Sequence, residues 1–247
     1  LPVPYAMTLL VLGSFVFAGV AAWLLVRELT GSSRAGLVAG LVFAFAPYRF
    51  DHYVNLELLW TGWMPLVLLA VHRAVDRGSW RAGVAFGLLF VAQALSCIYY
   101  SVLFGTVLVA FCAVLFVGLS GAAVRRAVLS LGCGGLIAGA LLAPYMTPYR
   151  QARTVVGERS IEEARVYSAK PADYLAATPD NRVYGALNAG PHEKQLFPGM
   201  LAILLALVAL WPPLSRQRIA YLVALVLVVD LSFGPAGVSY DWLREYV

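Results

Sequence analysis

Residues 4–26 read PYAMTLLVLGSFVFAGVAAWLLV, an apolar run that contains no charged residue and ends directly before Arg27. About twenty such residues are enough for a helix to cross the hydrocarbon core of a bilayer. The run therefore predicts a transmembrane helix at the start of the chain.

The composition of the whole chain agrees with this first run. Of its 247 residues, 61% are hydrophobic and only 13% are charged. Soluble domains are nearer half apolar and about a quarter charged. This small number of charged residues cannot cover the surface of a water-soluble fold of this size. We therefore expect part of the surface to contact a lipid bilayer.

The formal net charge of +5 does not indicate nucleic-acid binding, because the basic residues lie at the ends of apolar runs, where topology signals belong. Cys97, Cys112 and Cys133 lie in or beside apolar segments without metal-type spacing. We interpret them as small packing residues.

Seven further apolar runs follow the first one, and we expect an all-α membrane protein with about eight transmembrane helices and one long, partly ordered extracytoplasmic loop. The further runs are 35–48, 58–72, 82–96, 99–119, 127–145, 198–212 and 219–233. This assigns residues 1–146 to helices one to six and 147–197 to the loop. Residues 198–233 then hold helices seven and eight, and 234–247 form a last outer segment.

The arginines predict the orientation. One set of short connections holds nine of them, at positions 27, 34, 73, 77, 81, 125, 126, 216 and 218. The other set holds only Arg49 and Arg244. Cytoplasmic connections are the basic ones. We therefore predict a multi-pass protein of a bacterial cytoplasmic membrane with its chain start, long loop and chain end outside. An outside start also predicts at least one helix before Leu1.

A polar cluster follows the second run, in YRFDHYVNLELLW at residues 48–60: Arg49, Asp51, His52, Asn55 and Glu57. We predict catalytic roles for Asp51, His52 and Glu57, because a carboxylate here can act as a base or hold a divalent cation. On a helix Asp51 and Asn55 would share a face, with Glu57 about 120° from Asp51. In an extended segment Arg49, Asp51, Asn55 and Glu57 would line one side. An ordinary solvated turn is the alternative.

From the polar cluster, Arg49 and Asn55 are predicted to bind substrate. Two further sets of residues are predicted to bind substrate with them. Gln93, Ser96 and Tyr100 follow helical i, i+3, i+7 spacing beside Tyr99, and we expect them to line a cavity or to hydrogen-bond between helices. In the loop, a guanidinium or ammonium group suits a phosphate. The loop candidates are Arg150, Arg153, Lys170 and Arg182.

No resident metal is predicted. His52, His192 and Glu193 do not have diagnostic ligand spacing, although a divalent cation is compatible with the outer carboxylates. Asp230 is the one acidic residue inside an apolar run, near its outer end. No P-loop, GxGxxG, GxSxG, HExxH or CxxC motif appears, which argues against a nucleotide-driven pump, a Rossmann enzyme and a motif-type zinc protease.

A short pattern occurs twice, as GLVAGLVFAFAPY at 36–48 and GLIAGALLAPY at 135–145. Both copies contain Gly-xxx-Gly and end in Ala-Pro-Tyr. Small residues at this spacing allow helices to pack closely. We therefore expect close helix packing at these small residues, with Pro-Tyr at the membrane interface. A true structural duplication is the alternative.

Four stretches resemble bacterial polytopic proteins of the GT-C-type glycosyltransferase superfamily and its uncharacterised relatives. They are RAGLVAGLVFAFAPYRFDHYVNLELLWTGWMPLVLLAVHR at 34–73, QALSCIYYS at 93–101, PADYLAATPDNRVYG at 171–185 and HEKQLFPGMLAILLAL at 192–207. The resemblance implies that Asp51 and Glu57 fall in the second acidic outer loop. It also implies that the principal catalytic carboxylate precedes Leu1.

The leading hypothesis is therefore a glycosyltransferase that passes a sugar from a polyprenyl-phosphate carrier to an envelope glycan, lipid or protein on the outer face. A transporter or flippase for a lipid-linked or polar solute is the second hypothesis. A non-catalytic protein of envelope polymer assembly is the third.

Overall fold

The computed structural model describes residues 2–156, 160–186 and 194–240, and these residues form helices without a β-strand. The first half contains α1 (Val3–Thr30), α2 (Ser33–Ala44), α3 (Pro47–Asp51), α4 (Leu56–Leu59), α5 (Trp63–Arg77), α6 (Trp80–Ser96) and α7 (Ile98–Phe116). The second half contains α8 (Gly121–Val156), α9 (Ile161–Tyr167), η1 (Pro171–Leu175), α10 (Met200–Ala209), α11 (Arg216–Ser232) and η3 (Gly234–Ala236).

A helix lies in each of the eight apolar runs. Within the described residues, four helical segments are long and apolar enough to cross a membrane: Val3–Thr30, Leu56–Arg77, Ile98–Phe116 and Gly121–Tyr149. These segments fit a membrane-embedded protein. The count of eight crossings stays a prediction, because helices such as α2 and α10 are shorter.

Glycine and serine residues set several helix ends. Gly31 ends α1 in the left-handed conformation, with φ of +67°, and Gly78 ends α5 in the same way, with φ of +60°. Glycine adopts this conformation without the steric cost of a Cβ atom. Directly after Gly31, the Ser32 hydroxyl accepts the backbone N–H of Ala35 and caps α2.

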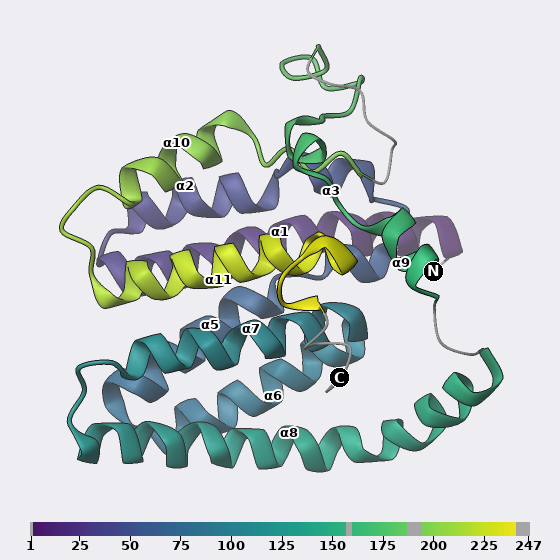
Figure 1. The fold of residues 1–247 in the computed structure, drawn as a ribbon. Coiled ribbons are helices and arrows are strands. Elements are labelled where there is room, and N and C mark those ends of the chain that lie inside the picture. The colour runs from purple at the N-terminus through teal and green to yellow at the C-terminus, as the bar shows by residue number, and fades with distance from the viewer. Residues whose placement is uncertain (1, 157–159, 187–193, 241–247) are drawn as a thin grey trace.

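The long helices lie side by side, with α2 and α10 along one edge of the bundle and α8 along the other (Figure 1). Helix α1 packs on α2 and α5, and α6 packs on α8. The buried core joins α5, α7, α8 and α11 around Val67, Val71, Phe111, Ala127 and Ala220. Many large apolar side chains of α1 remain exposed, as expected for a surface in contact with lipid.

The helix breaks between Ser96 and Ile98. Cys97 has extended backbone angles (φ −154°, ψ 105°), and α7 begins directly after it. The expectation that Gln93 and Tyr100 share one helix face is therefore wrong, because the two residues lie on different helices. The described cysteines are free thiols.

Helix α8 extends beyond the predicted loop boundary at residue 146. It continues through Pro144 and Pro148 to Val156, so residues 147–156, the start of the predicted outer segment, are helical. A proline inside a helix removes one hydrogen bond and favours a bend, but it does not always end the helix. The last turns of α8 extend past the neighbouring helices (Figure 1).

Only one copy of the repeated glycine pattern lies at a helix contact. A Cβ atom added at Gly40 would lie 2.6 Å from the Gly19 carbonyl oxygen, and one added at Gly36 would lie 2.7 Å from the Trp23 ring. Gly135 and Gly139 face open space. The expectation of a second contact there is wrong, because α8 turns a different face toward α6.

Candidate functional site

The short helix α3 places neighbouring residues in two different cavities. Its residues Pro47, Phe50 and Asp51 line one cavity, and Tyr48 and Arg49 line the other. Residues two apart on a helix point about 200° away from one another. Residues i, i+3 and i+4 share a face. The extended alternative, in which Arg49 and Asp51 line one side together, is therefore wrong.

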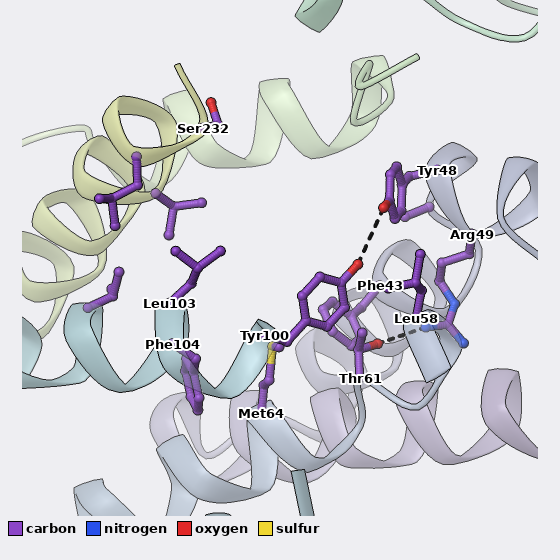
Figure 2. A pocket seen from close by; sticks show the side chains of 14 residues that line it. Phe43, Tyr48, Arg49, Leu58, Thr61, Met64, Tyr100, Leu103, Phe104 and Ser232 are labelled. Carbon is purple, nitrogen blue, oxygen red and sulfur yellow. Dashed lines mark hydrogen bonds between the residues drawn. The ribbon is translucent and has the colours of Figure 1, made fainter. Parts of the chain in front are cut away.

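The first cavity, called the apolar cavity below, has a volume of about 390 Å³. Its walls come mainly from α7 and α11 and are largely hydrocarbon, including Leu103 and Phe104 of α7 and Met64 at the start of α5. Polar groups gather at one end, where Tyr48, Arg49, Thr61 and Tyr100 lie, with Ser232 of α11 on the other side (Figure 2).

Arg49 is 5% exposed and is held by uncharged oxygen atoms. Its Nη1 donates to the Leu59 carbonyl oxygen at 2.9 Å and to the Thr61 hydroxyl at 2.7 Å, and its Nη2 donates to the Ser14 hydroxyl at 3.3 Å. The guanidinium carbon lies 4.7 Å from the centre of the Phe15 ring. These contacts fix the guanidinium but do not neutralise its charge.

No carboxylate lies within ion-pair distance of Arg49 in the part of the chain that the structure describes. Its Nε is buried and has no hydrogen-bond partner there. Burial lowers the pKa of the guanidinium from its ordinary value, because removal from water disfavours the charged form. The group nevertheless stays protonated at neutral pH. The polar end of the apolar cavity therefore carries a positive charge that would favour an anion.

The two tyrosines beside Arg49 come from different helices. The hydroxyl groups of Tyr48 and Tyr100 lie 3.3 Å apart, and either can be the donor (Figure 2). Tyr100 is among the residues predicted from the sequence, whereas Tyr48, Thr61 and Ser232 are not. The one signal of Tyr48 in the sequence is its place among the aromatic residues around the polar cluster (Phe50, Tyr53, Trp60 and Trp63), and Thr61 and Ser232 have no signal. Tyr99 is exposed and does not line the cavity.

The second cavity, called the polar cavity below, has a volume of about 800 Å³ and lies between α3 and the long segment after α8. Asp51 lines it from α3 and is 8% exposed. Thr178, Asp180 and Arg182 line it from the long segment. Asp51 and Arg182, both predicted from sequence, thus line the same cavity although they are 131 positions apart in the chain.

A turn and several tertiary contacts hold the long segment in place. Asn181 Oδ1 accepts the backbone N–H groups of Val183 and Tyr184, both at 3.0 Å. The Tyr174 hydroxyl lies 2.8 Å from the hydroxyl of Ser232, and the backbone N–H of Ala169 donates to the Ser232 carbonyl at 2.9 Å. Two short helices, α9 and η1, lie in this segment. The polar cavity is therefore built on ordered backbone.

The remaining predicted residues near α3 do not line either cavity. His52 is buried, stacks on the Tyr48 ring with centroids 4.0 Å apart, and contacts the Tyr48 carbonyl through Nδ1 at 3.1 Å. Asn55 and Glu57 are exposed at and after the start of α4. The site therefore contains Asp51 but not Glu57 as a wall residue.

Gln93 and Lys170 lie apart from both cavities. Gln93 is fully buried on α6, and both polar atoms of its amide have no hydrogen-bond partner within the described ranges. Lys170 is exposed, and its backbone N–H donates to Asp173 Oδ2 at 2.7 Å at the start of η1. Asp230 has a structural contact, because its carboxylate accepts the backbone N–H groups of Val238 and Ser239.

Four predicted residues lie partly or wholly outside the described part of the chain. Arg150 and Arg153 are on the backbone of α8, but their side chains are not described, and His192 and Glu193 are not described at all. Among the described residues, no group of three or more His, Cys, Asp or Glu side chains could hold a metal ion.

Comparisons of the chain with protein-family models, with curated proteins and with solved structures gave no match. The arrangement of the two cavities therefore carries the functional argument. One cavity suits a hydrocarbon chain that ends in an anionic group, and the other suits a polar, hydroxylated molecule beside a carboxylate.

Proposed function

We propose that the chain is a membrane glycosyltransferase-like protein that transfers a sugar from a polyprenyl-phosphate carrier to an acceptor on the outer face of a bacterial cytoplasmic membrane. The proposal rests on the two cavities that α3 separates. The buried guanidinium of Arg49 lines the apolar cavity on one side, and the carboxylate of Asp51 lines the polar cavity on the other.

The apolar cavity is the proposed donor site. Its hydrocarbon walls suit isoprenoid units, and Arg49 supplies a positive charge for the carrier phosphate where the medium is poorly polar. Tyr48 and Tyr100 offer hydroxyl groups at the same end. Because uncharged oxygen atoms already hold the guanidinium of Arg49 in place, it does not have to move when an anion binds.

The polar cavity is the proposed acceptor site. Asp51 would accept a hydrogen bond from an acceptor hydroxyl and orient it, or hold a divalent cation together with Asp180. Arg182 would bind an anionic or hydroxylated part of the acceptor. The exposed position of Glu57 makes it a weaker candidate than Asp51 for this work.

Sugar transfer by membranes that contain the full-length protein tests the proposal. The donor is undecaprenyl phosphate carrying a radiolabelled sugar, supplied as a panel of sugars, and the readout is label in the acceptor fraction. We expect Asp51→Asn to lower the rate at least tenfold, because the amide cannot accept a proton or hold a cation as the carboxylate does. Glu162→Gln, at an exposed carboxylate of α9 that lines neither cavity, is the control and should remain within twofold. Unchanged transfer by Asp51→Asn would remove Asp51 from the site.

A transporter or flippase is the second candidate, and the buried amide of Gln93 favours it. A buried polar group without a partner costs about 1–3 kcal/mol. Polar groups inside a bundle often mark a solute path. Proteoliposomes that move a solute, reduced by Gln93→Leu, without transferring sugar from any donor of the panel would select this candidate over the enzyme.

A further inference from the structure

A third cavity lies at the opposite end of the bundle from α3, among the arginines that mark the predicted cytoplasmic side. Its volume is about 460 Å³, and it is bounded by α1, α5 and α6. Arg73, Arg77 and Arg81 surround its polar end. Leu66 of α5 and Leu89 of α6 line it farther into the bundle. At a rise of 1.5 Å per residue, Leu66 lies roughly 16 Å along α5 from Arg77.

The polar end of this cavity carries more positive than negative charge. Glu28 of α1 accepts from Arg73 at 2.9 and 3.2 Å and from Arg77 at 2.6 Å. One carboxylate thus serves two guanidinium groups. The Arg73 and Arg77 side chains remain 43% and 64% exposed, which leaves donors available to a further acceptor.

Arg81 adds a third positive charge. Its guanidinium carbon lies 5.7 Å from the centre of the Trp80 ring, and no described carboxylate lies within ion-pair distance of it. Trp80 is itself exposed, as tryptophans at a membrane interface often are. Asp76 of α5 does not line the cavity. Three guanidinium groups against one carboxylate leave an excess of two positive charges at the polar end.

We propose that this cavity binds an anionic phospholipid of the surrounding leaflet, with the phosphate between Arg77 and Arg81 and an acyl chain along Leu66 and Leu89. Free phosphate would leave the apolar walls in contact with water, whereas a phospholipid covers both the walls and the arginines. A zwitterionic phospholipid would bring a cationic headgroup toward the excess positive charge. The site is independent of the proposed function, because it shares no residue with the two cavities beside α3.

Native mass spectrometry of the delipidated protein tests the proposal with three probes: palmitoyl-oleoyl-phosphatidylglycerol, palmitoyl-oleoyl-phosphatidylcholine and inorganic phosphate. We expect phosphatidylglycerol to be retained at least tenfold more strongly than phosphatidylcholine. The double variant Arg77→Gln/Arg81→Gln should lower that retention at least tenfold. Arg34→Gln/Arg125→Gln removes two exposed arginines of the same end, outside the cavity, and should remain within twofold of wild type.

A second pair of variants leaves every charge in place. Ala85→Phe fills the apolar part of the cavity and should lower phosphatidylglycerol retention at least fivefold, whereas Leu88→Phe, on the exposed face of the same helix, should not. The proposal would be overturned if the two double arginine variants lost phosphatidylglycerol equally, or if the two phospholipids were retained equally. Full retention of phosphatidylglycerol by Ala85→Phe, or its displacement by millimolar phosphate, would also overturn it.

Discussion

Arg49 and Asp51 lie two residues apart on α3, are both buried, and line different cavities. The short helix thus acts as a wall between a hydrocarbon-lined space and a polar one. If the protein binds a lipid-linked donor and a polar acceptor, the two would lie on opposite sides of α3.

Arg49→Met should destabilise the protein by about 1–3 kcal/mol, because the Leu59 carbonyl and the Thr61 and Ser14 hydroxyls would lose their buried donor. Arg49→Lys should recover only part of this, because one ammonium group does not match the planar fork that reaches all three oxygens. The thermal unfolding midpoint in detergent measures both. Arg34→Met, at an exposed arginine, is the control, and an Arg49→Met midpoint equal to wild type would contradict the assigned contacts.

Leu103→Trp should weaken binding of undecaprenyl phosphate at least tenfold, because the larger side chain would occupy part of the apolar cavity while leaving Arg49 in place. Val102→Trp is a closely matched control: it lies one residue earlier on α7, is 39% exposed where Leu103 is 41%, and does not line the cavity. Quenching of a labelled polyprenyl phosphate measures binding. Similar affinities for the two variants would argue against this cavity as the donor site.

Gly40→Ala should destabilise the α1–α2 contact by about 1–3 kcal/mol, because its Cβ would meet the Gly19 carbonyl oxygen at 2.6 Å. Gly139→Ala has open space around it and should be neutral or slightly stabilising, since alanine is the better helix former. Unfolding in mixed micelles of increasing denaturing detergent compares them. An equal cost for both would mean that close packing at Gly40 is not the cause.

Tyr53→Cys and Arg125→Cys should react with a membrane-impermeant maleimide from opposite sides of the membrane, in a protein whose native cysteines have been replaced. Tyr53 is exposed beside α3, and Arg125 is exposed at the arginine-rich end. The arginine distribution predicts labelling of Tyr53→Cys in intact cells and of Arg125→Cys only after permeabilisation. The reverse order of labelling would invert the proposed orientation and move the proposed chemistry to the cytoplasm.

Much of the candidate site was predictable from local pattern. Arg49 and Asp51 are candidates because they belong to a polar cluster directly after an apolar run, and Arg182 is a candidate because a guanidinium in the long loop suits a phosphate. All three line a cavity. Thr61 and Ser232 could not have been found in this way. A single hydroxyl beside an apolar helix is common, and its importance here comes only from the distant groups that fold next to it.

The sequence by itself determined which segments are apolar helices, where glycine and serine residues end or begin several of them, and that arginines collect in alternate connections. These properties depend on neighbouring residues and on transfer of side chains from water, so they can be recognised along the chain. Only the tertiary structure decided how each helix is rotated and where it bends. Two copies of the same glycine spacing therefore differ, with Gly40 at a helix contact and Gly139 in open space. The rotation of α3 likewise separates Arg49 from Asp51, because the side of a helix that becomes buried depends on partners far away in the sequence.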